Sequence, residues 1–133
     1  MPLERPAALD ASYELTYRVA AMPADTNYRG DIFGGWIMSQ VDIAGSVLAV
    51  RETRGRVATV AVQQFQFLAP VLVGDLVSCY ARVARVGNTS ITIHVEVYAA
   101  RQFDDPQLHR VAESTMTYVA LDEHGRPRPA ARA

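Results

Sequence analysis

Hydrophobic residues fill the stretch from position 32 to position 50, which holds a single ionisable side chain, Asp42. Apolar residues recur there with the spacing of a helix, at Phe33, Trp36, Ile37, Val41, Ala44, Val47 and Leu48. A helix on the surface of a globular domain carries a charged face, and this stretch cannot supply one. The pattern therefore predicts a helix over residues 32–50 that is buried nearly all round.

Most of the remaining hydrophobic positions follow the period of β-strands, in which every second residue faces the same side. Loops rich in Pro, Gly, Asn or Asp separate these runs, including a hairpin turn at 87–88 and a loop at 102–107. Residues 57–68 are apolar on both faces, which predicts a central strand. In all, strands are predicted at residues 12–19, 57–68, 76–86, 89–100 and 108–121.

One strand, one helix and four strands in succession indicate an α+β domain with an antiparallel sheet. The sheet must curl around the helix, because no other element can cover so apolar a surface. The domain is predicted to span residues 11–122, between a flexible N-terminus at 1–10 and a flexible tail at 123–133.

Composition narrows the possible partners. With 13 basic and 14 acidic residues the net charge is −1, which gives no general attraction to nucleic acid or acidic membranes. Polar residues and a central carboxylate argue against a membrane span at 32–50. The single Cys79 excludes an internal disulfide and, with three scattered histidines, a Cys/His zinc pattern, so no metal site is expected. No signal-peptide pattern is present at residues 1–10, and a cytoplasmic protein is expected.

Asp42 is the first candidate for chemistry. A carboxylate inside an apolar helix must find hydrogen-bond partners or shift its pKa upward, because removing a charge from water is costly. Both outcomes occur at functional sites. The alternative is a structural carboxylate that only braces the core.

The start of the helix is the second candidate. Asp31 is placed to cap it, and Gly34 and Gly35 in the first turn would let a ligand approach bare backbone N–H groups. The glycines could equally serve tight packing. At the other end, Gly55 is available for the C-terminal turn.

The remaining reactive side chains give weaker signals. Cys79 alternates with apolar residues in its strand, which favours an inert core thiol over a nucleophile. His94 lies beside Glu96 on the polar face of its strand, which favours a solvated or interface position.

Four segments together resemble a known family. They are DTNYRGDIFGGWIMSQVDIAG at 25–45, TVAVQQFQFLAPVLVGD at 59–75, CYARV at 79–83 and GNTSITIHVEV at 87–97. They are similar to the signature of hotdog-fold acyl-CoA thioesterases, above all the bacterial YciA-type hydrolases, over residues 11–121. The resemblance implies a five-stranded antiparallel sheet wrapped around one central helix. It also implies a dimer with one ten-stranded sheet and active sites at the dimer interface.

The resemblance also assigns roles to residues. The catalytic carboxylate of the family falls on Asp42, and the backbone donors that polarise the thioester carbonyl fall on Gly34 and Gly35 of the opposite subunit. Asp31 stands where mammalian relatives have Asn, and Phe33 stands where they have His. The other predicted contacts are Thr59 and Gln63 at the shared site, and Arg85, Asn88, Thr89 and Ser90 at the coenzyme A phosphates.

The resemblance implies hydrolysis of acyl-CoA to a carboxylic acid and CoA without metal or organic cofactor. Asp42 would act as a general base on water or as a nucleophile. A homo-oligomer is expected, with the dimer as the functional unit and a trimer of dimers as the assembly; a dimer or tetramer is the alternative. The competing functions are a hotdog hydratase or dehydratase, which needs a His paired with an acid, and a non-catalytic acyl-CoA binding or regulatory module.

Overall fold

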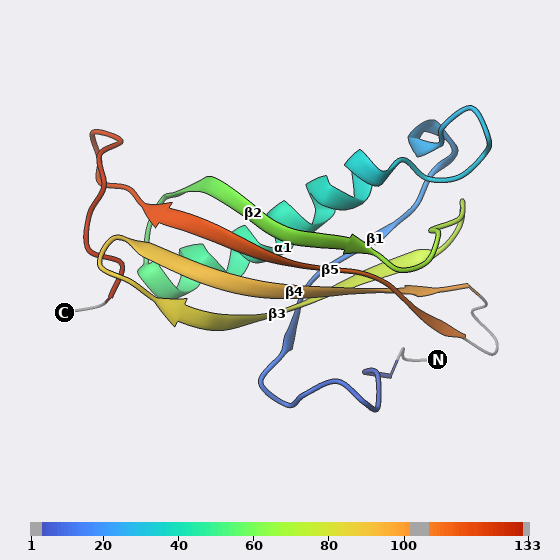
Figure 1. Cartoon of the computed structure of the whole chain (residues 1–133), viewed down its shortest axis with the longest axis horizontal. Coiled ribbons are helices and arrows are strands. Elements are labelled where there is room, and N and C mark those ends of the chain that lie inside the picture. The colour runs from blue at the N-terminus through green and yellow to red at the C-terminus, as the bar shows by residue number, and fades with distance from the viewer. Residues whose placement is uncertain (1–3, 102–106, 132–133) are drawn as a thin grey trace.

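One long helix lies in the concave face of a five-stranded antiparallel sheet in the part of the chain that the structure describes (Figure 1). The structure is a computed structural model and describes residues 4–101 and 107–131. Across the sheet the strand order is β1-β3-β4-β5-β2, with every neighbouring pair antiparallel. The elements are β1 (Glu14–Ala20), the 3-10 helix η1 (Pro23–Asp25), α1 (Gly34–Thr53), β2 (Val57–Phe67), β3 (Leu76–Val86), β4 (Ser90–Ala100) and β5 (Leu108–Ala120).

These elements confirm the predicted α+β class and each predicted strand and helix to within three residues at either end. The predicted loop at 102–107 lies outside the described residues, apart from Gln107.

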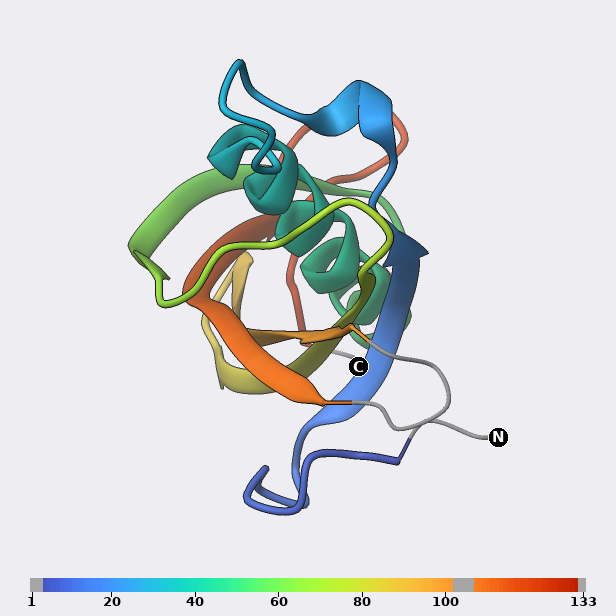
Figure 2. The same cartoon turned by 90° about the vertical axis from the view of Figure 1, so that its right-hand side faces the viewer.

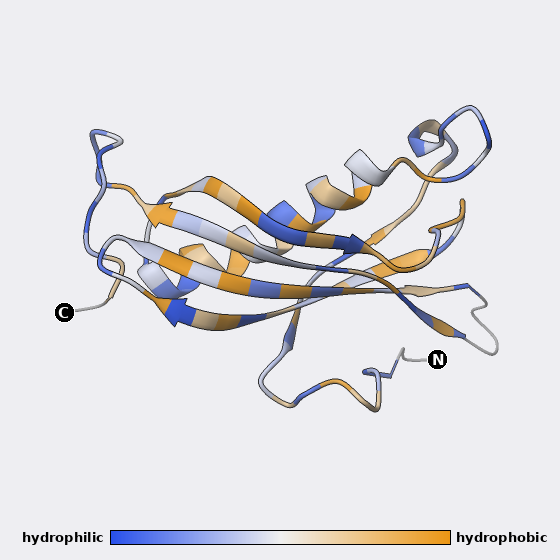
Figure 3. Cartoon of the chain, viewed as in Figure 1, coloured by the Kyte–Doolittle hydropathy of each residue, from blue (hydrophilic) through white to orange (hydrophobic). Residues whose placement is uncertain are grey.

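The core lies between the helix and the inner face of the sheet. Seen from the end, the strands curl around α1 (Figure 2). Val41 and Ala44 of the helix are fully buried against inward residues of β4 such as Ile93 and Val95. Hydrophobic and polar residues alternate along β4 (Figure 3) because only one of its faces meets the helix. Each such aliphatic side chain contributes about 1.5–3 kcal/mol to folding, so this layer fixes the position of α1.

The helix is not buried all round within one chain, contrary to the prediction. The N-cap residue Phe33 and four apolar side chains of α1 are between 38% and 52% exposed; those four are Met38, Ile43, Val47 and Val50. Among the described residues no helix is long and apolar enough to span a membrane. The sequence pattern was that of a buried helix, but this chain supplies the covering for only part of its surface.

Strand β2 is an edge strand within the chain, which corrects the prediction of a central strand for 57–68. It pairs with β5 on one side, and Val60, Val62 and Phe67 are 44–56% exposed. The register with β5 shifts at two points, and Gln64 adopts a left-handed backbone with φ +52°. An apolar pattern on both faces indicates burial of a strand, and in one isolated chain that burial is incomplete.

The ends of α1 also differ from the prediction. Phe33, not Asp31, is the N-cap residue, and no side chain caps the helix. At the C-terminal end Arg54 takes the left-handed conformation, with φ +56°, that was expected of Gly55. Gly55 lies beside the Arg128 guanidinium, the flexible end of a side chain in the C-terminal tail.

Described residues near both ends of the chain pack against the sheet, and the flexibility of segments 1–10 and 123–133 stays a prediction. Leu9 is 8% exposed and packs with Tyr80 and Tyr98. Ala130 is 2% exposed, and its N–H donates to the Asn88 carbonyl at 2.9 Å. The tail therefore covers the β3–β4 hairpin.

Candidate active site

The Asp42 carboxylate is held by two hydroxyl groups from the sheet. Thr59 of β2 donates from Oγ1 to Asp42 Oδ1 at 2.7 Å, and Tyr118 of β5 donates from its hydroxyl to the same oxygen at 3.2 Å. The Tyr118 hydroxyl also lies 2.9 Å from the main-chain carbonyl of Asp42. The carboxylate has therefore found hydrogen-bond partners, which is one of the two outcomes predicted for it. Hydrogen bonds to an ionised group are stronger than bonds between neutral groups.

The second carboxylate oxygen, Oδ2, accepts no hydrogen bond from any residue that the structure describes. Asp42 also lines a hollow of about 220 Å³ whose other walls are mostly apolar. An unengaged carboxylate oxygen at the wall of a mostly apolar hollow can act on a bound ligand or water. The hollow is lined by Met38, Ser39, Asp42, Thr59, Val62, Phe65 and Met116.

Tyr118 is a member of the site that the sequence analysis missed. Its side chain is fully buried, and burial together with the nearby charge of Asp42 raises its pKa well above the ordinary value. It therefore remains protonated and acts as a donor. The signal was present in the alternation of β5, where a tyrosine stands among inward apolar positions and its hydroxyl needs a partner in the core.

The N-terminus of α1 carries unpaired backbone donors. The N–H groups of Gly34 and Gly35 have no acceptor among the described residues, and no side chain caps this end. Around Gly35 there is open space, whereas a Cβ on Gly34 would lie 3.2 Å from the Phe67 ring. Gly34 therefore serves packing and the backbone of Gly35 is accessible, while ligand contact there stays a prediction.

Asp31 and Gly34 line a second hollow of about 400 Å³, beside Phe67 and Leu68. Asp31 is exposed, and its carbonyl accepts the Asn27 N–H. It therefore stands near the helix N-terminus without capping it.

The two parts of the predicted site are separated within one chain. Gly34 and Asp42 are eight positions apart on one helix, which corresponds to about 12 Å at 1.5 Å per residue. A single thioester carbonyl cannot contact the helix N-terminus and the carboxylate of the same chain at once. The helix N-terminus and Asp42 are thus separate places within one chain.

None of the other predicted binding residues lines the Asp42 hollow in the part of the chain that the structure describes. Gln63 is exposed on β2 and does not line the Asp42 hollow. The β3–β4 hairpin lies at the opposite end of the molecule from the start of α1 (Figure 1). It carries Arg85, Asn88, Thr89 and Ser90, and its Asn88 and Thr89 carbonyls accept N–H groups from residues 130 and 120.

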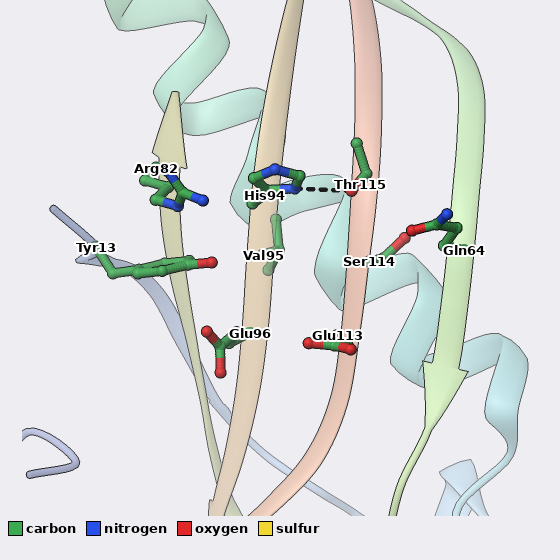
Figure 4. Close-up of a pocket in the computed structure, with 9 residues that line it drawn as sticks. All are labelled: Tyr13, Gln64, Arg82, His94, Val95, Glu96, Glu113, Ser114 and Thr115. Carbon is green, nitrogen blue, oxygen red and sulfur yellow. Dashed lines mark hydrogen bonds between the residues drawn. The ribbon is translucent and has the colours of Figure 1, made fainter. Parts of the chain in front are cut away.

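A polar hollow on the outer face of the sheet contains His94 (Figure 4). His94 shares a 2.7 Å hydrogen bond with Thr115, and Arg82 lies over the Tyr13 ring at 5.2 Å. Its neighbours Ile93 and Val95 point to the helix, so His94 points away from Asp42 and the two do not form the His–acid pair of a hydratase. Burial and the charge of Arg82 lower the pKa of His94.

The same face holds Glu96 and Glu113, which stand directly opposite each other on β4 and β5. Arg110 binds both carboxylates and so offsets their repulsion. On the inner side, Cys79 is fully buried and burial raises the pKa of its thiol to about 12, as expected for an inert core cysteine.

Comparison with known proteins identifies the family. The sequence model of the Thioesterase superfamily matches residues 29–102. The acyl-CoA thioester hydrolase YciA of Salmonella typhimurium is 52% identical over 118 residues, which cover 87% of this chain and 89% of that protein. The chain belongs to the thioesterase superfamily.

Solved thioesterases agree in fold. The hexameric thioesterase y2039 from Yersinia pestis has a TM-score of 0.84 at 50% identity, covering 92% of this chain and 98% of that chain. A hexameric hotdog fold thioesterase of Campylobacter jejuni has a TM-score of 0.85 at 40% identity, covering 90% and 92%. The resemblance and the hotdog fold expected from the sequence motifs are confirmed.

Proposed function

We propose that this protein hydrolyses acyl-CoA thioesters to a carboxylic acid and coenzyme A, and that Asp42 is its catalytic residue. The observation that carries the proposal is the Asp42 carboxylate, anchored through Oδ1 and unengaged at Oδ2, in the wall of an apolar hollow. The apolar walls of such a hollow would bind an acyl chain, and the carboxylate in its wall would lie next to the thioester of that chain.

Two routes use the same oxygen. As a general base, Asp42 Oδ2 takes a proton from water while that water attacks the thioester carbon; the C–S bond then breaks and the proton passes to the departing sulfur. As a nucleophile, Oδ2 attacks the carbon itself, the thiolate leaves, and water cleaves the resulting anhydride. A single turnover in labelled water separates the routes, because only the second leaves solvent oxygen in the Asp42 carboxylate.

In this proposal the backbone donors come from a second subunit. The N–H groups of Gly34 and Gly35, at the positive end of the helix dipole, would stabilise the developing oxyanion. They lie too far from Asp42 of the same chain for that, which supports a site completed by the partner, with Asp31 at its rim.

A homo-oligomer would complete this arrangement. The unpaired edge of β2 and the exposed apolar side of α1 favour pairing of two chains into a ten-stranded sheet, since an open apolar strand edge promotes association. The thioesterases of Yersinia pestis and Campylobacter jejuni are hexameric, which favours a trimer of such dimers here.

Coenzyme A would then extend away from the thioester. We place its phosphates at the β3–β4 hairpin, where Arg85 is exposed and supplies charge, and Asn88, Thr89 and Ser90 supply polar groups. Gln63 on the exposed edge of β2 would contact substrate only across the subunit boundary.

Release of free thiol from a panel of acyl-CoA substrates of increasing chain length tests the proposal. Steady turnover above the uncatalysed rate is expected on at least one of them, and substitution of Asp42 should remove it. Tight acyl-CoA binding without turnover on any chain length would instead favour the non-catalytic binding module.

A further inference from the structure

We infer that Tyr118 is a positioning residue, which orients the Asp42 carboxylate, and that position 45 is glycine to let its hydroxyl reach that carboxylate. Its kinetic test rests on the proposed function, and its structural argument rests on the geometry around Asp42. Tyr118 would be the third residue of the site, after Asp42 and Thr59.

The sheet places the two hydroxyl donors side by side. Thr59 on β2 and Tyr118 on β5 are direct partners in the strand register, and both hydroxyls converge on Asp42 Oδ1. Because both hold the same oxygen, the carboxylate cannot rotate freely, and Oδ2 is directed away from them. A reacting group held in one orientation reacts faster than one that rotates, since misplacement by about 1 Å can cost on the order of 100-fold in rate.

Tyr118 also ties the reacting residue to the sheet through the backbone. Its hydroxyl lies 2.9 Å from the Asp42 carbonyl, so the same group fixes both the side chain and the main chain of Asp42. Thr59 contacts only the side chain. Loss of the tyrosine hydroxyl would therefore loosen Asp42 more than loss of a single side-chain contact.

Gly45 lies three residues after Asp42, on the same side of α1. A Cβ at this position would overlap the Tyr118 hydroxyl and lie 3.1 Å from ring carbons Cε2 and Cζ. Glycine inside a helix costs about 1 kcal/mol relative to alanine, so it persists there for a reason other than helix stability. Admission of the tyrosine hydroxyl to Asp42 is that reason.

The electrostatic surroundings of Asp42 are simple. Tyr118 on β5 is the titratable side chain that contacts it, and the other described residues that line its hollow are uncharged. Burial keeps Tyr118 protonated, since its pKa is raised well above the ordinary value. The protonated hydroxyl therefore donates to the Asp42 carboxylate.

The test compares Tyr118→Phe with a matched Tyr98→Phe variant. Tyr98 is also buried, and its hydroxyl donates to Glu96 at 3.0 Å on the outer face, away from Asp42. Tyr118→Phe should lower kcat about 10- to 100-fold with KM little changed. Tyr98→Phe should leave both kcat and KM unchanged, and equal effects on kcat in both variants would overturn the inference.

Gly45→Ala supplies a second arm. The added methyl should displace the hydroxyl and reproduce the kinetic defect of Tyr118→Phe. The double variant should be no slower than the slower single variant, because both changes remove one interaction. Defects that multiply would show that Gly45 acts independently of Tyr118.

An NMR measurement that does not depend on turnover separates this inference from the proposed function. Carboxyl carbons of labelled aspartates can be observed by NMR at one fixed pH, with Asp42→Asn assigning the signal of Asp42. The chemical shift of that signal should change in Tyr118→Phe, which removes a hydrogen bond to Asp42 Oδ1, and not in Tyr98→Phe. An unchanged chemical shift in Tyr118→Phe overturns the inference, whereas absence of thiol release from the unaltered protein overturns only the proposed function.

Discussion

Replacing Asp42 with Asn separates a catalytic role from a structural one, because shape is kept while the basic oxygen is lost. The amide oxygen can still accept from Thr59 and Tyr118, so both hydroxyls keep a partner. Each bond weakens from a charged one of about 1.5–3 kcal/mol to a neutral one of about 0.5–1.5 kcal/mol. Thr59 is exposed, so water screens part of its share. The expected loss of stability is about 1–2 kcal/mol.

The loss of activity should be larger. A positioned general base contributes about 10²–10⁴-fold, which is about 3–5 kcal/mol of the barrier. Thiol release and thermal unfolding are measured on the same preparation. We expect Tm to fall by about 3–8 °C while kcat falls at least about 100-fold.

Asp75→Asn is the matched control. Asp75 is 1% exposed and pairs with Arg101, whose Nε lies 3.1 Å from its Oδ1. Breaking this pair should cost about 2–4 kcal/mol, discounted for the partial exposure of Arg101, with kcat unchanged below the melting range. An Asp42→Asn variant that melts as early as this control but retains its kcat would refute the catalytic assignment.

Three further outcomes are expected. Val60→Lys on the β2 edge should lower the oligomer mass in light scattering and thiol release with it, while Leu15→Lys on the β1 edge should leave both unchanged. Gly35→Ala should raise Tm, since alanine favours the helix by about 1 kcal/mol and meets open space, yet lower kcat by blocking the backbone donors. The pKa of His94 is lowered in the folded protein, so the His94 imidazole binds a proton more readily in the unfolded chain. The free energy of unfolding should therefore decrease as pH falls below 6.5, and this decrease should be smaller in His94→Gln.

The fold, and Asp42 as a candidate for chemistry, could be predicted because each leaves a local signal. Asp42 is the one ionisable residue in a long apolar stretch, and the strands alternate with a period of two. Those patterns depend only on residues close to one another in the sequence, so the sequence alone reveals them.

Long-range geometry could not be predicted in the same way. Whether Tyr118 or another inward residue of β5 lies under Asp42 depends on strand register, and bulges near Thr59 and Gln64 shift that register on β2. The N-cap was assigned to Asp31 on residue preference, but the chain turns so that Phe33 takes that place. The contacts of the tail could not be predicted, because arginine and proline content describes composition and not contacts.

The sequence predicted a helix buried all round, and the structure leaves one side of α1 exposed. This difference and the separation of the α1 N-terminus from Asp42 have the same origin. The apolar composition of a segment indicates how much of its surface is buried in the final assembly. It does not indicate which chain buries that surface. Here the exposed side of α1 and the edge of β2 remain uncovered in one chain, and that chain also keeps its backbone donors about 12 Å from its carboxylate. An antiparallel partner across β2 would cover the apolar surface and bring the donors of one helix toward the carboxylate of the other. Stability and catalysis would then depend on the same contact, so selection for either would preserve the apolar sequence of this helix.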